Sequence, residues 1–457
     1  MKTKTALTLI ALLLFAACNP WRSYRRTPHV TVDVRLPLFQ HIKLDNGLSF
    51  YGITDTYVPL VKIRIAFRAG AASVPPGKTG SMLLLYEYLH RSQRKILEQF
   101  DTLGASPSFF VDINETAIDV TINATDTPKA MELLSDMLRK PEFDASRFEQ
   151  IKKRRIAEIQ NALRMPSTLS NRALQKSVYG NGHPLSVSGR ELLTEMSALR
   201  VEDLYHAYEE FVGPENIAII MAGSISDIQM RALCRKYFGD WKSNAIEAPA
   251  LLSPQLRLRT AILTIEKPGL QRTYISLGGQ GVGAGSDEEY PLRIADQALS
   301  GHINGQLQRK GIPCTNGFQI NAMHGTGHFI LNCDVKKEKT WEALDEIMST
   351  IFLTQMADFH GSRMPSLRSN QIWNMIGPFQ SLGGAISKLS TLFWNHLPDN
   401  FYIKSIDTIQ QVNKEEVELA LHKFFDRERI HIVLVGDPSV FANKNSTRFG
   451  PIQLTSP

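Results

Sequence analysis

Four groups of residues have types and spacing that could do chemistry. Glu87 and His90 are three residues apart, so on a helix they would offer a carboxylate and an imidazole to a metal ion from one face, although His90 could equally cap the helix end. Cys314 could act as a nucleophile only beside a histidine. The stretch from Gly278 to Gly285 lacks the spacing of a phosphate-binding loop and is typical of a turn. The basic run from Lys152 to Arg155 is typical of a solvated helix face.

Composition excludes several classes of protein. The chain has 457 residues, of which 43% are hydrophobic and 21% charged, so it can bury the cores of two domains of roughly 200 residues each. The formal net charge is +6, with no basic tail and no nucleic-acid-binding motif, and we therefore predict no nucleic-acid partner. Four cysteines without a CxxC pair exclude a disulfide scaffold and a zinc ribbon.

The first residues carry an export signal. Two lysines precede an apolar run from Ala6 to Phe15, which is too short to span a bilayer and ends at Ala-Ala-Cys18. This pattern resembles a bacterial lipobox and predicts a lipoprotein signal peptide over 1–17, a lipid on Cys18 and a tether over 18–38; the alternative is an ordinary signal peptide with an incidental cysteine. No acidic run, which would resemble a surface-export signal, follows Cys18, so we expect a lipid-anchored protein of the bacterial cell envelope that faces the periplasm.

The chain repeats its plan once, 213 residues later. The run Ile217 to Gly223 resembles Ile430 to Gly436, and each is a β-branched strand that ends in glycine after a helical segment. The helices Lys129 to Leu138 and Glu342 to Phe352 are related by the same offset. The repeat predicts two homologous α+β domains with helices on a mixed or antiparallel sheet, facing each other across a cavity. The predicted boundaries are 39–243 for the first domain, 244–258 for a linker, 259–441 for the second domain and 442–457 for a tail.

A string of short motifs in the first half is more specific. In order, the motifs are Leu44-Asp45-Asn46-Gly47-Leu48, Ala66 to Gly70, Gly77-Lys78-Thr79-Gly80, Leu103-Gly104-Ala105, Pro141-Glu142-Phe143, Ala157-Glu158-Ile159, His183-Pro184-Leu185 and Asn216 to Gly223. Over about residues 36–440 the chain resembles the insulinase/pitrilysin metallopeptidase family in its short two-domain form. The resemblance implies two domains of the LuxS/mitochondrial processing peptidase-like type in a clam-shell arrangement, and a zinc peptidase frame.

The zinc motif of that family is lost here. Its helix carries His-x-x-Glu-His, in which two histidines hold zinc and the glutamate activates the bound water, and a glutamate further along completes the ligands. Placed from Gly80, the resemblance puts the first histidine on Leu83, the catalytic glutamate on Tyr86 and the second histidine on Glu87. Only Glu158 matches, as the third ligand. One carboxylate cannot hold catalytic zinc, so we expect no catalytic residue, no metal and no cofactor in this chain.

The second half of the site is changed as well. In active members of the family, an arginine and a tyrosine of the second domain bind substrate. The arginine falls on Gln308, unless Arg309 stands in for it, and the tyrosine falls on Cys314. Because both halves of the site are degraded, we expect a pseudo-peptidase without activity of its own.

Three hypotheses for the function follow. Several short-form members work as pairs, so the resemblance implies a heterodimer with a zinc-bearing homologue, in which this chain helps to bind unfolded, extended peptides in a shared chamber. Alternatively, the protein is a stand-alone peptide-binding or scaffold lipoprotein. The third hypothesis is a zinc metallopeptidase with a non-standard metal site made of Glu87, His90 and Glu158.

Overall fold

The computed structural model describes residues 36–70, 73–74, 77–111, 116–249, 253, 255–312, 314, 317–356, 363–442 and 446–455. The chain separates into a unit of Met1–Leu36 and a compact unit of Pro37–Pro457. The predicted signal peptide, the lipidation site Cys18 and residues 18–35 of the tether lie outside the described residues. In the part of the chain that the structure describes, every helix is too short or too polar to cross a bilayer.

The first half of the compact unit is built on a mixed sheet, sheet A. Among the described residues it has six strands in the order β1-β2-β6-β3-β5-β4. β2 and β6 are parallel and the other pairs are antiparallel. Every residue of β6 is buried, as expected for a central strand covered on both faces. The strands are β1 (Gln40–Lys43), β2 (Ser49–Thr54), β3 (Leu60–Phe67), β4 (Ser108–Val111), β5 (Thr116–Asn123) and β6 (Ile217–Gly223).

The second half is built on sheet B, in which the described residues form seven strands in the order β12-β13-β7-β11-β8-β10-β9. β11 runs parallel to β7 and antiparallel to β8, so this sheet is mixed as well. The strands are β7 (Ile262–Glu266), β8 (Arg272–Gln280), β9 (Phe318–Met323), β10 (Thr326–Lys336), β11 (His431–Gly436), β12 (Ser446–Thr447) and β13 (Gly450–Leu454).

The two sheets share one plan. An offset of 213 carries β3 onto residues 273–280, where β8 lies, and β6 onto residues 430–436, where β11 lies. The strand order β2-β6-β3-β5-β4 of sheet A therefore corresponds to β7-β11-β8-β10-β9 of sheet B. The prediction of two homologous α+β domains is confirmed, and the strands of each sheet fall within the residue ranges predicted for the two domains, with β12 and β13 as the exception.

Residues 442–457 were predicted as a tail, and this prediction is wrong for its described part. β13 pairs in parallel with β7, at the sheet position where β1 pairs antiparallel with β2 in sheet A. Without β13 the outer edge of β7 would leave its backbone groups unpaired. The repeat did not reveal this strand because α9 follows β6 in the first half, whereas a short helix and two strands follow β11 in the second.

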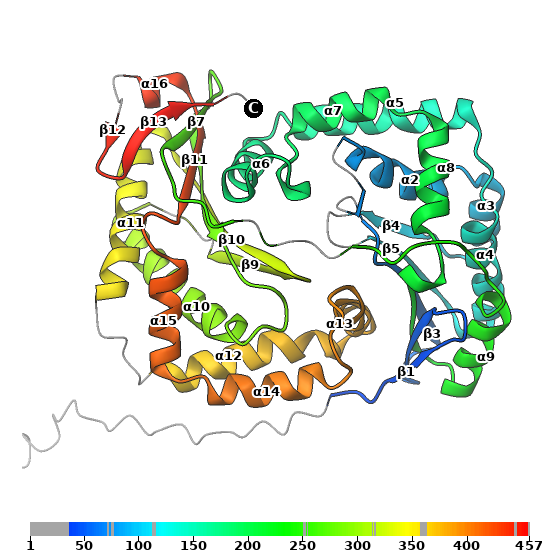
Figure 1. Cartoon of the computed structure of the whole chain (residues 1–457). Coiled ribbons are helices and arrows are strands. Elements are labelled where there is room, and N and C mark those ends of the chain that lie inside the picture. Colours follow the sequence, from blue (N-terminus) through cyan, green and yellow to red (C-terminus); the bar gives the residue numbers. More distant parts are fainter. Residues whose placement is uncertain are drawn as a thin grey trace, which may run out of the picture. The chain divides into compact units, whose positions relative to one another are not determined.

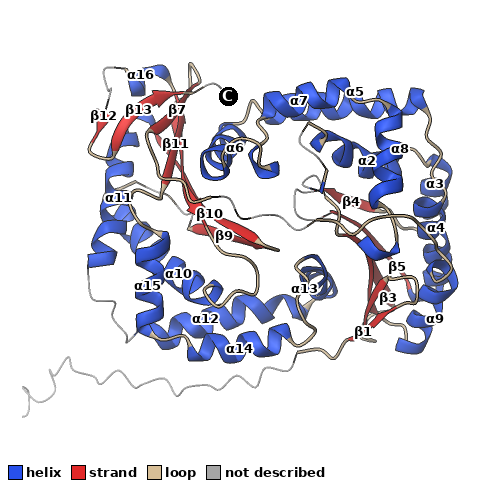
Figure 2. Ribbon diagram, viewed as in Figure 1, coloured by secondary structure: helices blue, strands red, loops and turns tan. Residues whose placement is uncertain are grey.

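Helices cover the sheets (Figure 2); for example, α9 packs on β2, and α11 packs on β8 and β10. The helices of the first half are α2 (Thr79–Arg91), α3 (Arg94–Thr102), α4 (Thr127–Arg139), α5 (Ala145–Ala162), α6 (Pro166–Tyr179), α7 (Gly189–Ala198), α8 (Val201–Phe211) and α9 (Asp227–Phe238). Those of the second half are α10 (Glu289–Arg309), α11 (Thr340–Met356), α12 (Met364–Ile376), α13 (Leu382–Trp394), α14 (Phe401–Gln411), α15 (Lys414–Phe424) and α16 (Pro438–Phe441).

Each half lends one helix to the sheet of the other half. α6 packs against β8 and β11 of sheet B, and α13 packs against β3 and β6 of sheet A (Figure 1). The two helices are equivalent, because the offset of 213 carries α6 onto residues 379–392, where α13 lies. Leu174 and Val178 of α6 share an apolar cluster with Ile265 and Val433 of sheet B, so the two halves are joined by a core as well as by the chain.

Candidate functional site

Helix α2 carries three of the positions that the resemblance assigns to the metal site. The helix begins at Thr79 and ends at Arg91, and the two basic residues of its last turn complement the helix dipole. From Thr79 to Leu89 every residue except Leu83 is buried, because the helix packs against α5, α7, α8 and β4. A helix that is apolar on nearly all sides is expected to be a packing element.

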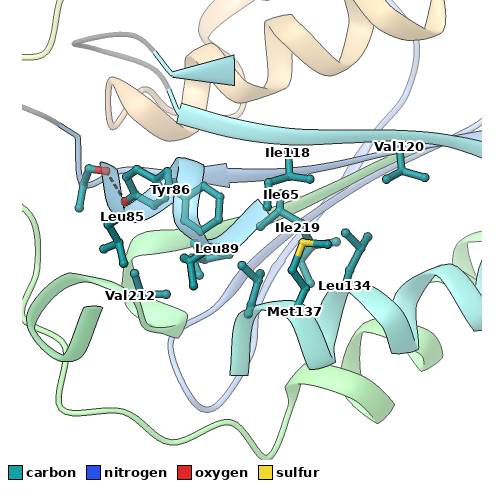
Figure 3. Close-up of a cluster of buried hydrophobic side chains, with 14 of the residues drawn as sticks. Ile65, Leu85, Tyr86, Leu89, Ile118, Val120, Leu134, Met137, Val212 and Ile219 are labelled. Atoms are coloured by element: carbon teal, nitrogen blue, oxygen red, sulfur yellow. Dashed lines mark hydrogen bonds between the residues drawn. The ribbon is translucent and has the colours of Figure 1, made fainter. Parts of the chain in front are cut away.

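Tyr86 and Leu83 belong to the core of the first half. The Tyr86 hydroxyl donates a hydrogen bond of 2.5 Å to the carbonyl of Ala69, and its ring centroid lies 4.7 Å from that of Phe67. Figure 3 shows Tyr86 among the buried side chains, and dashed lines there mark hydrogen bonds between the residues drawn. Burial raises the pKa of Tyr86, so the hydroxyl stays protonated and remains a donor. Leu83 packs at the margin of the same cluster and offers no ligand atom.

Glu87 is a buried carboxylate held by arginines. Its side chain is 7% exposed. Arg91, one turn along α2, donates from Nε to Glu87 Oε1 at 2.9 Å, and Nε of Arg155 on α5 lies 3.8 Å from Oε2. Burial raises the pKa of Glu87, although the charges of Arg155 and Arg91 lower it. The position to which the resemblance assigns the second histidine is thus occupied by an acid that two protein cations neutralise.

Glu158 on α5 is held by the same arginine. Arg154 Nε donates to Glu158 Oε1 at 2.9 Å, and Arg155 Nη1 donates to Oε2 at 3.2 Å. Burial acts to raise the pKa of Glu158, but the hydrogen bonds from both arginines outweigh it and hold the pKa below its usual range. Arg155 therefore makes ion pairs with both Glu87 and Glu158 and connects α2 to α5.

These residues do not fit a catalytic zinc ion. Such a site needs three protein ligands, and here Leu83 has none to offer while the protonated phenol of Tyr86 is a donor. Glu87 and Glu158 are both paired with Arg155, whose positive charge would repel a divalent cation between them. Within the described ranges, no three His, Cys, Asp or Glu side chains are grouped so that they could hold a metal ion.

His90 points to a different part of the molecule. Its Nε2 lies 3.1 Å from the carbonyl oxygen of Pro107, and its ring stacks on that of Phe109 at 5.7 Å. Burial lowers the pKa of His90. The structure brings Glu87 and Glu158 to one arginine and directs His90 toward the chain before β4, so the three residues of the non-standard metal hypothesis do not converge.

The positions to which the resemblance assigns the substrate-binding arginine and tyrosine lie at the end of α10 and just after it. Gln308 and Arg309 are exposed, and Arg309 Nε donates to the carbonyl of Gly305 in its own helix at 3.2 Å. Cys314 forms a disulfide with Cys333 of β10, so it has no free thiol to act as a nucleophile. The segment that should carry the tyrosine is instead tied to sheet B.

The roles of Arg91 and Arg155 were not predicted from the sequence. Arg155 was predicted to lie on a solvated basic face, and its neighbours Lys153 and Arg154 are indeed exposed. The pairs Glu87–Arg91 and Arg155–Glu158 have the four- and three-residue spacing of helix ion pairs, which was a signal available in the sequence. The contact between Arg155 and Glu87 joins two helices far apart in the chain and left no such signal.

Comparison with known families matches both halves of the chain. Residues 82–188 match the family described as "Insulinase (Peptidase family M16)". Residues 198–359 match the description "Peptidase M16 inactive domain". The chain belongs to the insulinase (M16) family. The first match begins within α2, so the helix of the candidate site lies in the insulinase part of the chain.

Two curated relatives align with part of the chain. It is 26% identical over 220 residues to "Uncharacterized zinc protease YmxG" of Bacillus subtilis, which covers 48% of this chain and 52% of that protein. It is 25% identical over 233 residues to "Probable mitochondrial-processing peptidase subunit beta" of Schizosaccharomyces pombe, covering 48% of this chain and 50% of that protein. The chain thus spans about half the length of these curated relatives.

The fold matches solved structures over most of its length. The crystal structure of a peptidase M16 inactive domain from Pseudomonas fluorescens superposes with a TM-score of 0.79, covering 88% of this chain and 98% of that chain. The sequence identity is 17%, so this likeness shows the fold alone. The M16 frame is therefore present in both halves, and the sequence of α2 contains no His-x-x-Glu-His.

Proposed function

We propose that this chain is a non-catalytic member of the insulinase family, and that it is the zinc-free subunit of a peptidase heterodimer that binds extended peptides. The observation that carries the proposal is the guanidinium of Arg155, which pairs with both Glu87 and Glu158. In the family, as the resemblance implies, zinc would be held by a histidine at the position of Glu87 and a glutamate at the position of Glu158, and the metal ion would neutralise that glutamate. Here a side chain of the protein does so, and the helix that should hold zinc is packed as part of the core.

The chain lacks the groups that hydrolysis would require at this position. Zinc-dependent hydrolysis uses a metal-bound water and a base that accepts its proton. The Tyr86 hydroxyl donates to Ala69, and Glu87 is paired with Arg91 and Arg155. Neither side chain is placed to accept a proton from water, so this site has no hydrolytic role of its own.

A preserved frame with an altered site favours a binding role beside an active partner. The fold match over 88% of this chain supports a function that needs the whole frame. One of the relatives is by its name a beta subunit, which supports assembly with a second chain. We therefore propose a zinc-bearing homologue as the partner, unfolded peptides as the ligands, and zinc in the partner alone.

The cell envelope is the proposed location. The N-terminal pattern predicts a lipid anchor on Cys18 and exposure to the periplasm. The disulfide between Cys314 and Cys333 supports an oxidising compartment, because such bonds persist outside the reducing cytosol.

The experiment that tests the proposal is purification of the tagged, membrane-extracted protein from its native host. Co-purifying chains are identified, and zinc content and cleavage of an unstructured peptide are measured for the complex and for this chain alone. We expect zinc and cleavage only when a homologue with His-x-x-Glu-His is present. Stoichiometric zinc and cleavage by this chain alone would overturn the proposal, and a lone protein that still binds peptide would favour the stand-alone peptide-binding lipoprotein.

A pair of variants on α5 separates the proposal from the non-standard metal site. Glu158→Gln should change neither the zinc content nor the activity of the complex, because Glu158 serves only to pair with arginines. Lys153→Gln, an exposed change of the same charge magnitude on the same helix, is the matched control. Loss of zinc or of activity in Glu158→Gln but not in Lys153→Gln would favour a metal site that includes Glu87, His90 and Glu158.

A further inference from the structure

A cavity of about 530 Å³ lies between the two halves of the compact unit. One wall comes from α6 and the start of α7, and the other from the segment before β7, from β7 itself and from β13. Its volume is in the range of ordinary ligand sites. The cavity is close to the Arg155 network, because the charge of Arg155 acts on Arg172 in its wall.

The cavity is lined by more positive than negative charge. Lys176 pairs with Glu191, with Nζ 3.1 Å from Oε1. The guanidinium groups of Arg172, Arg190 and Arg257 also line it, and within the described part of the chain none of these three has a carboxylate partner. Three cations without counter-charges around one space repel one another and attract an anion.

Arg172 is the most deeply placed of the three. It is half-buried on α6, and its Nη1 donates to the carbonyl of Val187 at 3.1 Å. Burial lowers the pKa of Arg172, and the positive charge of Arg155 lowers it further. A carbonyl oxygen satisfies one of its donors but does not neutralise its charge, so an anionic ligand would supply what the protein does not.

The position of Arg257 depends on a glycine. Gly180 ends α6 with a φ of 76°, and a Cβ atom there would come within 2.7 Å of Nη1 of Arg257. The absence of a side chain lets the guanidinium lie against the end of α6 beside the cavity. Arg190, in the first turn of α7, is exposed and lines the same cavity.

Apolar side chains also line the cavity. Leu169 belongs to the apolar cluster that α6 shares with sheet B, and Leu263 of β7 packs against that cluster. Leu163 packs against both the first core and this second cluster. A ligand that fits these walls therefore carries an anionic group next to an apolar group, a combination that a free inorganic anion lacks.

We propose that this cavity binds the C-terminal carboxylate of an extended peptide whose last side chain is apolar. The carboxylate would accept hydrogen bonds from Arg172, Arg190 and Arg257, and the side chain would lie on the leucines. The inference rests on the proposed function, since it states how a bound peptide would be anchored.

The test uses fluorescence anisotropy with the full mature chain, purified together with its co-purifying chains, and an unstructured labelled peptide that ends in leucine. The peptide is compared as the free acid, as the C-terminal amide, and as an amide with a glutamate in the last position but one. We expect the free acid to bind about tenfold more tightly than either amide, which corresponds to the loss of one charge-assisted contact. Arg172→Gln and Arg257→Gln should each remove most of this preference.

Control variants distinguish carboxylate anchoring in this cavity from peptide binding in general. Arg235→Gln, an exposed change on α9 away from the cavity, should keep the preference for the free acid. Arg257 is exposed, so its variant tests the site even if Arg172→Gln does not fold. Equal binding of the free acid and the amide would overturn this inference and leave peptide binding standing. Tight binding of the glutamate-bearing amide would reassign the site to acidic side chains. No binding of any peptide would contradict the proposed function as well.

Discussion

Helices α2 and α10 occupy equivalent places in the two halves but treat buried charge differently. On α2, Glu87 forms an ion pair with Arg91 and lies near Arg155. The offset of 213 carries Leu83 onto Asp296 of α10, whose Oδ1 accepts a hydrogen bond of 2.8 Å from Ser300. Burial raises the pKa of Asp296 to about 7, so this acid is held largely by a neutral hydroxyl. Both helices hold a buried glutamate with an arginine one turn along, Glu87 with Arg91 on α2 and Glu289 with Arg293 on α10. The difference is that α10 carries a further acid, Asp296, at a position where α2 has a leucine.

The exchanged helices differ in a similar way. α13 docks on sheet A near Arg64, which makes two hydrogen bonds to Asp119 and one each to Ser387 and Ser390 of α13. α6 docks on sheet B through two buried histidines: His328 contacts Tyr179 of α6, and His431 contacts Ser177 of α6. One interface uses a permanent charge and the other uses groups that titrate. The two halves should therefore respond differently to acid.

The largest predicted effect is acid destabilisation of the α6 interface. Nδ1 of His328 lies 2.8 Å from the Tyr179 hydroxyl, and Nδ1 of His431 lies 2.6 Å from Ser177 Oγ. Burial lowers the pKa of each histidine from 6.5 to about 4, and Arg259 and Arg257 oppose protonation of His431 further. Between these pH values the unfolded chain binds more protons, so the free energy of unfolding falls as the pH falls from 6.5 to 4, by about 3 kcal/mol for each histidine.

Urea unfolding across this pH window measures the effect. His328→Gln cannot gain a proton, so it should lose its share of the pH dependence. The titration of Asp296 changes stability with pH in the opposite direction. Because Asp296 is present in both the wild-type protein and His328→Gln, its contribution cancels when the two are compared. An unchanged pH dependence in His328→Gln would show that the α6 interface is not the acid-sensitive one.

The next largest effect is expected in the α13 interface. Trp394 is 6% exposed, and its Nε1 donates to the carbonyl of Phe67 at 2.9 Å. Trp394→Ala should lower the free energy of unfolding by about 4 kcal/mol, because it leaves a cavity and an unpaired carbonyl. Trp373 on α12 is 52% exposed, so Trp373→Ala is the matched control and should cost less than about 1 kcal/mol. Equal losses in the two variants would contradict the assignment of Trp394 to the interface.

The disulfide distinguishes the halves on a smaller scale. Cys314 and Cys333 close a loop with a sequence separation of 19 in the second half, while the equivalent positions of the first half are Asp101 and Val120. Cys314→Ser should lower the free energy of unfolding by about 3 kcal/mol, and hydrogen exchange should increase in sheet B alone. Reduction of the native protein should have the same effect, and Cys234→Ala should remain sensitive to reductant because Cys234 is a free, buried thiol. Increased exchange in sheet A would argue against this local role.

The features that were predicted are visible in local sequence patterns, whereas those that were missed depend on contacts between segments far apart in the chain. The strands β6 and β11 were visible as β-branched runs 213 residues apart, and motif order placed Leu83, Tyr86 and Glu87 on one helix. The exchange of α6 and α13 was not predicted, because an apolar helix face does not specify which sheet covers it. The pairing of Arg155 with Glu87 depends on how α2 and α5 pack, and helix spacing reports only on pairs within one helix.

The smallest effects should have opposite signs in the two halves. Asp296 is half-buried with a raised pKa, so the unfolded chain ionises first and stability falls as the pH rises from 3.8 to about 7. Asp296→Asn should therefore stabilise the protein above pH 7, by about 1 kcal/mol after allowance for its partial exposure. Glu158 has a lowered pKa, so Glu158→Gln should destabilise the protein, by less than about 1 kcal/mol. The equivalent position of the second half is already a glutamine, Gln371. Urea unfolding above pH 7 compares the two variants, and shifts of the same sign would mean that α2 and α10 handle buried charge alike.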